Sequence, residues 1–291
     1  MQSISAFRTD APVPLEAYRQ VDAAIKVAAR QAMIGRRLTP LYGPLGFGTQ
    51  SITYDLLTEV ADATLEFAWS ARGSEDTGLT ARTVTKVPVL KKPFRINARS
   101  LASMRESGIR LDTATAKSAA YKVSKLEDDL ILDGFAADGS TYDLNGLYQA
   151  ANNTEATSKD FGTALYAIQK VNLALAVLET DNIYPPVNMV LNPTQYREMF
   201  DVVTNTAVAE VDVVQRIIGG HIYETSAQTA ATGMLVAAGD RGFFDLAVGV
   251  DTTSMMEILP LNFGKDLYGV VYECVVPRIW ETNAICTLTN I

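Results

Sequence analysis

The chain has 291 residues, of which 48% are hydrophobic, and a formal net charge of -8 at pH 7. This length fits two domains, or one domain with long excursions. The net negative charge argues against a general nucleic-acid binder, because phosphate binding needs clustered lysines and arginines. No apolar run approaches the length of a membrane span, which argues against a membrane protein.

The cysteines, Cys274 and Cys286, both lie in apolar runs that are typical of strands. We interpret them as buried thiols in preference to a disulfide. Reduced thiols suit a cytoplasmic protein, so we expect the chain to be cytoplasmic.

The N-terminal part of the chain predicts a helix followed by a loop. Pro14 opens the helix, which runs to about Met33 and ends at Gly35. The next segment, 41–50 (LYGPLGFGTQ), contains three glycines and a proline. This composition predicts a shaped loop, which is neither helix nor strand.

Residues 62–92 predict a long arm of two strands. Leu65, Phe67 and Trp69 alternate with polar or small residues, as expected for a strand, and a return strand follows. An isolated hairpin is marginally stable in water. We therefore expect this arm to lie on another subunit.

The longest predicted helix spans 112–134, with Asp112 as N-cap and Gly134 as the stop. Glu127 falls inside its apolar stripe. Burying an unpaired carboxylate is costly, so we expect this helix to be docked against a cationic group. The stripe otherwise consists of Ala116, Ala119, Ala120, Val123, Leu126, Leu130 and Ile131.

The C-terminal half reads as an α/β module followed by closing strands, after a turn-rich boundary at 138–146. This order predicts a platform built from both ends of the chain, with a compact domain inserted. Helices are expected at about 160–178, 193–203 and 211–218, and strands at about 187–191, 221–225, 233–238, 244–250, 255–263, 268–280 and 284–289.

The chain contains no recognisable catalytic constellation. Its single histidine, His221, has no Cys or Asp at a useful spacing. The glycine-rich loop lacks the Lys-Ser/Thr of a phosphate-binding loop. The acidic pairs Glu75-Asp76 and Asp128-Asp129 are interpreted as solvated faces. We expect no catalytic residue, cofactor or metal, and a soluble α/β enzyme is kept only as a distant alternative.

Separated segments of the chain resemble parts of one known family. They are AARQAMIGRRLTPLYGPLGFGTQSITYD at 28–55, KLEDDLILDG at 125–134 and NAICTL at 283–288. In order, they resemble the N-terminal helix and loop, the end of the long spine helix and the closing strand of encapsulin (linocin-like) nanocompartment shell proteins. This family is related to tailed-phage major capsid proteins.

The resemblance implies an α+β fold, that of the tailed-phage major capsid protein (Hong Kong 97-type). This fold has a P-domain, an extended E-loop and an A-domain. The expected division is 1–50 for the N-terminal helix and loop of the P-domain, 51–96 for the E-loop, 97–145 for the P-domain with the spine helix, 146–250 for the A-domain and 251–291 for the closing strands of the P-domain.

The resemblance further implies a self-assembling icosahedral shell that performs no chemistry and encloses a cargo enzyme. Such cargo is often a ferritin-like protein or a dye-decolourising peroxidase, recognised through a short C-terminal targeting peptide. The alternative is the major capsid protein of a tailed virus, found in the virion and enclosing DNA. The helical N-terminal segment and the net acidity favour the first, whereas Pro40, where the family often has Asp, and a longer E-loop tip favour the second or a divergent encapsulin.

Some family positions can be matched to this sequence. The cargo peptide of the family docks near residues that correspond here to Met33, Ile34, Arg36 and Leu38. The alternative is that these are core and interface residues.

The resemblance also places a pore and a flavin position. The loop Thr204-Asn205-Thr206 matches the rim of the five-fold pore, and its uncharged side chains predict a small neutral opening. A tryptophan tied to flavin in some members falls at Arg99, which predicts no flavin.

Within this framework, Glu127 becomes part of a specific hypothesis. We expect it to form a structural ion pair with Arg36 or Arg37, from the segment just before the glycine-rich loop, within or between subunits.

Overall fold

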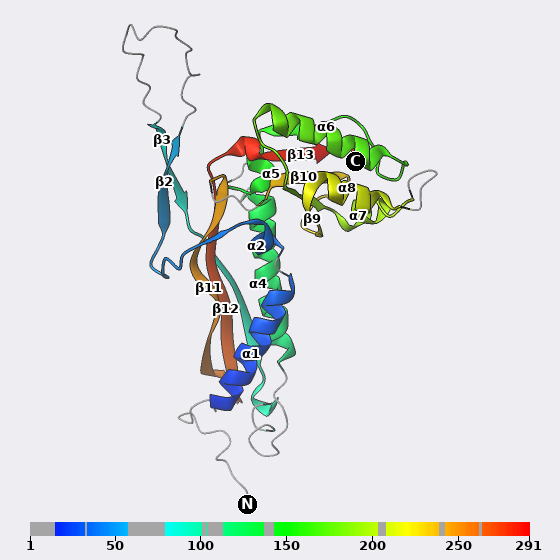
Figure 1. The fold of residues 1–291 in the computed structure, drawn as a ribbon. Coiled ribbons are helices and arrows are strands. Elements are labelled where there is room, and N and C mark those ends of the chain that lie inside the picture. Colours follow the sequence, from blue (N-terminus) through cyan, green and yellow to red (C-terminus); the bar gives the residue numbers. More distant parts are fainter. Residues whose placement is uncertain are drawn as a thin grey trace, which may run out of the picture.

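The computed structural model describes residues 15–32, 34–57, 79–100, 103, 113–136, 143–202, 208–238, 242–261 and 264–291. Figure 1 shows an elongated unit, a compact unit at one end of it, and a ribbon that projects away from both. Within the described residues, no helix is both long and apolar enough to cross a membrane.

The elongated unit is a sheet covered on one face by helices. In the described part of the chain, its strand order is β1-β11-β12-β4. The strands are β1 (Leu41–Tyr42), β4 (Val89–Ile96), β11 (Phe244–Leu261) and β12 (Gly264–Ile279). Helix α4 (Ala114–Leu132) packs on β4 and β12, and α1 (Leu15–Ala32) packs on α4. Because successive side chains of β4 point to opposite faces of the sheet, Leu90 and Phe94 point into this core while Lys91 is exposed.

Helix α4 is the expected long helix. The residues of its apolar stripe are buried, apart from Leu126, which is 41% exposed. The small alanines of the stripe allow α1 to approach closely, and Val21 and Ile25 of α1 are fully buried there. The long helix of the elongated unit was thus predictable from its periodicity.

The compact unit is built on a second sheet, with the described strand order β7-β13-β10-β8-β9. The strands are β7 (Asn153–Glu155), β8 (Val187–Leu191), β9 (Gly219–Glu224), β10 (Thr232–Ala237) and β13 (Ile285–Thr289). Helices α6 (Tyr166–Thr180) and α8 (Glu210–Ile218) share a core with one face. Residues of the other face, such as Val190 and Met234, join the core around α4. One hydrophobic cluster therefore joins the two units, and a second cluster lies inside the compact unit.

Local helix signals in the compact unit are confirmed. The side chain of Asn192 accepts a hydrogen bond from the Thr194 N–H, and Pro193 begins α7 (Pro193–Glu198). Helix α8 ends at Gly219, whose φ of 65° is the left-handed conformation that glycine favours. The remaining short elements are α2 (Gly35–Leu38), α5 (Leu147–Ala150), η2 (Thr282–Ala284), β5 (Gly134–Phe135) and β6 (Leu144–Asn145).

Long-range pairing differs from the expected division in several places. Strand β13, expected with the P-domain, lies between β7 and β10 of the compact unit. The boundary expected between 250 and 251 falls inside β11. Leu41 and Tyr42, expected in a loop, form β1 and pair in parallel with β11. Local sequence does not reveal these partners, because a strand pattern does not say which edge it will join.

The ribbon consists of β2 (Ser51–Leu57) and β3 (Leu79–Lys86). The two strands pair antiparallel, and the pairing begins with Ser51 opposite Lys86. It leaves the elongated unit where the Val87 N–H donates to the Gln50 carbonyl, at 2.9 Å. The alternating residues Leu65, Phe67 and Trp69 lie outside the described residues.

Candidate functional site: a buried ion cluster beside a pocket

Helix α2 is fixed to α4 by Asp128. The Asp128 carboxylate accepts hydrogen bonds from the N–H groups of Ile34, at 3.1 Å, and Gly35, at 2.9 Å. A Cβ at position 35 would lie 2.6 Å from the Ile131 side chain, so a larger residue there would force this buried side chain to move. Burial raises the pKa of Asp128 to about 6, although these hydrogen bonds oppose the shift. The interpretation of Asp128 as part of a solvated face is therefore wrong, because it is buried.

Arg36, the next residue of α2, lies among carboxylates from three elements. Its Nε donates to Glu127 Oε1 of α4 at 2.6 Å, and its Nη1 donates to Asp251 of β11 at 2.8 Å. Its Nη2 donates to Glu273 of β12. Glu127 and Glu273 are fully buried, whereas the side chain of Asp251 is 75% exposed. The expected contact of Glu127 with an arginine is thus made by Arg36 within one subunit, while Arg37 is exposed.

The buried carboxylates outnumber the positive charge beside them. Burial and the charge of Glu273 raise the pKa of Glu127 to about 8, against the opposing effect of Arg36. Burial also raises the pKa of Glu273. Among the described residues, Glu127 Oε2 is buried and has no hydrogen-bond partner. A proton on Glu127 would let it donate to Glu273, and the raised pKa values of both carboxyls favour a proton on this pair.

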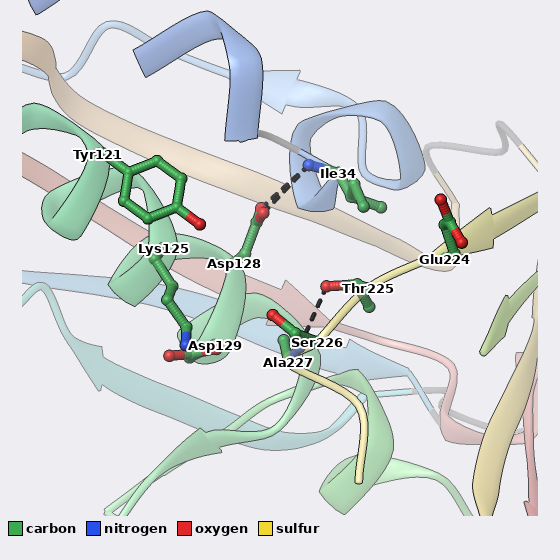
Figure 2. Close-up of a pocket in the computed structure, with 9 residues that line it drawn as sticks. All are labelled: Ile34, Tyr121, Lys125, Asp128, Asp129, Glu224, Thr225, Ser226 and Ala227. Atoms are coloured by element: carbon green, nitrogen blue, oxygen red, sulfur yellow. Dashed lines mark hydrogen bonds between the residues drawn. The ribbon is translucent and has the colours of Figure 1, made fainter. Parts of the chain in front are cut away.

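A pocket of about 220 Å³ lies beside Asp128, between α4, the start of α2 and the end of β9 (Figure 2). Figure 2 shows the side chains of Lys125 and Asp129 pointing toward each other. Burial raises the pKa of Asp129, and the charge of Lys125 opposes this. The residues that line the pocket are Ile34, Tyr121, Lys125, Asp128, Asp129, Glu224, Thr225, Ser226 and Ala227.

The residues matched to cargo binding lie in different surroundings. Ile34 is half-buried and lines the pocket. The side chain of Arg36 is bound by the carboxylates described above. Leu38 is only 2% exposed and belongs to the core of the elongated unit. Met33 lies outside the described residues. Of these described residues, Ile34 is the one that reaches the pocket.

Other predicted positions add little to this site. The pore residues Thr204, Asn205 and Thr206 lie outside the described residues. Cys274 and Cys286 are free and buried, as expected. His221 is exposed, with its ring beside that of Tyr223. Within the described residues, no group of histidine, cysteine and acidic side chains has an arrangement that would hold a metal ion.

Comparison with known proteins decides the family. The model of the Linocin_M18 family, described as "Encapsulating protein for peroxidase", matches residues 5–255. The chain belongs to this family. It is 26% identical over 280 residues to the type 1 encapsulin shell protein EncA of Myxococcus xanthus, covering 95% of this chain and 93% of the relative. It is 24% identical over 247 residues to a type 1 encapsulin shell protein of Brevibacterium linens, covering 84% of this chain and 85% of the relative.

Solved structures agree on the fold. The virus-like particle of Pyrococcus furiosus superposes with a TM-score of 0.69 at 19% identity, covering 94% of this chain and all of that chain. The capsid of the Myoviridae phage XM1 gives a TM-score of 0.63 at 13% identity, covering all of this chain and 97% of that chain. The expected tailed-phage capsid fold is confirmed. The chain is a shell-forming protein of the encapsulin family, and its role is structural, not catalytic, as expected.

Proposed function

We propose that copies of this chain assemble into a closed icosahedral shell that encloses a cargo enzyme in the cytoplasm. The observation that carries the proposal is the match to an encapsulating family over residues 5–255. In this proposal the β2–β3 ribbon is the E-loop, and the elongated and compact units correspond to the P-domain and the A-domain.

The ribbon gives a physical reason for assembly. In the described part of the chain, β2 and β3 hydrogen-bond only to each other, and Val84 on β3 is 61% exposed. A ribbon of this kind is marginally stable by itself in water. A neighbouring subunit would cover it and stabilise it, which favours assembly over an isolated monomer.

The proposed cargo is a ferritin-like protein or a dye-decolourising peroxidase, held through a short C-terminal targeting peptide. The family description names peroxidase as the encapsulated protein, which supports the second type. The pocket beside Ile34 is the proposed docking site, because it is the cavity that one of the matched residues lines. The loop Thr204-Asn205-Thr206 would rim a small neutral pore, and Arg99 would leave the shell without flavin.

Expression of the chain alone tests assembly. Shells elute in the void volume of a sizing column and appear as closed particles by negative-stain electron microscopy. Elution as a monomer or small oligomer would contradict the proposal. The ratio of absorbance at the nucleic-acid and protein maxima separates an empty shell from a DNA-filled capsid, which is the alternative suggested by the likeness to phage capsids.

Co-expression with a fluorescent protein tests the pocket. The C-terminal peptide of a ferritin-like or peroxidase protein encoded beside this chain is fused to the fluorescent protein. Loading is expected with the native shell and lost with Ile34→Asp, while Tyr184→Ala, at an exposed site in the compact unit, leaves it unchanged. Full loading of intact Ile34→Asp shells would exclude this pocket.

A further inference from the structure

The guanidinium of Arg278, near the end of β12, is fixed on several sides. It is 7% exposed, and its Nε donates to Asp245 Oδ1 of β11 at 2.8 Å while its Nη2 donates to Oδ2 at 2.5 Å. Its Cζ lies 4.2 Å from the centre of the Tyr42 ring and 4.8 Å from that of Trp280. A two-point bond to a carboxylate, combined with stacking on aromatic rings, holds an arginine in one orientation.

The group around Arg278 also contacts the ribbon, through Trp280. The rings of Trp280 and Tyr54, on β2, meet edge to face, with centres 5.8 Å apart and planes at 73°. This contact joins the ribbon to the elongated unit at a point away from the ribbon's root. Tyr54 lies four residues beyond Gln50, which is about 13 Å along a strand.

A ribbon held only at its root would pivot there. The Val87–Gln50 hydrogen bond fixes one point of the ribbon, and the Tyr54–Trp280 contact fixes a second. Two separated points define a direction. Trp280 is itself held against the buried Arg278–Asp245 pair, so the second point belongs to the rigid part of the sheet. An edge-to-face aromatic pair supplies about 0.5–1.5 kcal/mol beyond the area it buries.

We propose that the Tyr54–Trp280 contact is a strut that sets the angle between the ribbon and the elongated unit. This inference rests on the proposed function, because the angle at which a subunit reaches its neighbour determines the curvature of a shell. Tyr54 and Trp280 are positioning residues for shell assembly. The Arg278–Asp245 pair holds Trp280 in place and so anchors the strut. The strut would narrow the range of ribbon angles that the subunit can take.

Hydrogen exchange of the native protein and of Trp280→Ala tests the strut directly. Loss of the contact is expected to speed exchange in residues 51–57 and 79–86 by about two- to tenfold, the range for one aromatic pair. Exchange in α6 and β8 is expected to stay unchanged. Trp280→Phe keeps a ring beside both Tyr54 and Arg278, so it should restore near-native exchange. Tyr54→Ala should match Trp280→Ala, and the double variant should add little.

Particle size is the second readout. Electron microscopy of Trp280→Ala and Tyr54→Ala is expected to show mixed diameters or open fragments where the native protein gives one diameter. Tyr184→Ala, at an exposed residue of the compact unit, is the matched control. The strut would be refuted if Trp280→Ala showed both the native rate of hydrogen exchange in the ribbon and the native particle diameter. If the native chain forms no particles, the proposed function fails, and the exchange measurement on the unassembled subunit still decides the strut.

Discussion

In each unit a cation links segments that are far apart in the sequence, and Arg36 and Lys170 are held in different ways. In the elongated unit, Arg36 joins α2, α4, β11 and β12 by bonding to side-chain carboxylates. In the compact unit, the fully buried Lys170 of α6 donates to three backbone carbonyls. These belong to Glu155 at 2.8 Å, Thr157 at 2.6 Å and Thr289 at 2.9 Å. Both cations connect segments that are far apart in the sequence.

The difference lies in the groups that surround them. The carboxylates around Arg36 titrate, so the charge balance in the elongated unit changes with pH. The carbonyls around Lys170 do not titrate. The Glu155 carboxylate, whose Oε1 lies 3.8 Å from Lys170 Nζ, has a lowered pKa, so this site depends mainly on the lysine staying charged. Burial lowers the pKa of Lys170, and the nearby Glu155 opposes this. Thus the C-terminal strand of the compact unit is held by a bond pattern that is insensitive to moderate pH, while the elongated unit contains a proton-dependent cluster.

Removing Arg36 should have the largest effect. Arg36→Met leaves Glu127 and Glu273 buried without a cation, which typically costs about 3–5 kcal/mol. The expected result is a large fall in the urea midpoint of the subunit, or insoluble expression. Arg37→Met, at the exposed neighbour, should stay within about 0.5 kcal/mol of the native protein. Equal stability of the two variants would show that the cluster does not hold the elongated unit together.

Removing Lys170 should have a smaller effect. Lys170→Met is similar in length and apolar, but it leaves the carbonyls of β7, the following loop and β13 without their donor. Unsatisfied buried polar groups cost about 1–3 kcal/mol. The free energy of unfolding from urea titration should fall by about this amount, with faster hydrogen exchange at the C-terminal strand. Lys122→Met, at an exposed site on α4, is the control, and a Lys170→Met protein as stable as this control would refute the role.

The smallest expected effect at a fixed pH is that of Glu127→Gln, and its signature is in the pH dependence. Because the pKa of Glu127 is raised to about 8, we expect it to keep its proton in the folded protein up to about pH 8, whereas the ordinary pKa of 4.5 applies to the unfolded chain. Between these values the folded state binds the extra proton. The free energy of unfolding therefore falls as pH rises, by up to about 1.4 kcal/mol per pH unit, and levels off above about pH 8.

Glutamine mimics the protonated carboxyl, because it still donates one hydrogen bond and accepts another. The variant should lose this part of the pH dependence. Asp128, whose pKa is raised to about 6, is present in both proteins and titrates mainly below pH 6.5. The two proteins are therefore compared by urea titration between pH 6.5 and 8. Parallel curves for native and variant protein in that range would show that Glu127 is ionised throughout.

The sequence revealed Glu127 because a carboxylate interrupted an apolar stripe. Lys170 satisfies the same rule, since it falls among the buried residues Ala167, Val171 and Ala174 of α6. A charged residue inside an apolar stripe thus marks a buried charge in both units. Asp128 was missed for a different reason. It adjoins the polar face of α4, and its partners are backbone amides more than ninety positions away, which no local pattern shows.

Strand positions were predictable and strand partners were not. The buried run 187–191 was expected and is β8. The closing strand was also expected, but its place between β7 and β10 depends on which sheet edge is open after folding. Likewise, the contact of Trp280 with Tyr54 joins residues that only the assembled sheet brings together. The three-dimensional fold, reached through family resemblance, was therefore predicted better than the contacts that hold it.

Electron cryomicroscopy of the chain expressed alone tests the central claim most directly. We predict closed particles with icosahedral symmetry, in which the β2–β3 ribbon of each copy lies across a neighbouring copy and the Arg36 cluster is contained within each subunit. Monomers or small open oligomers, with the ribbon free in solvent, would contradict the account.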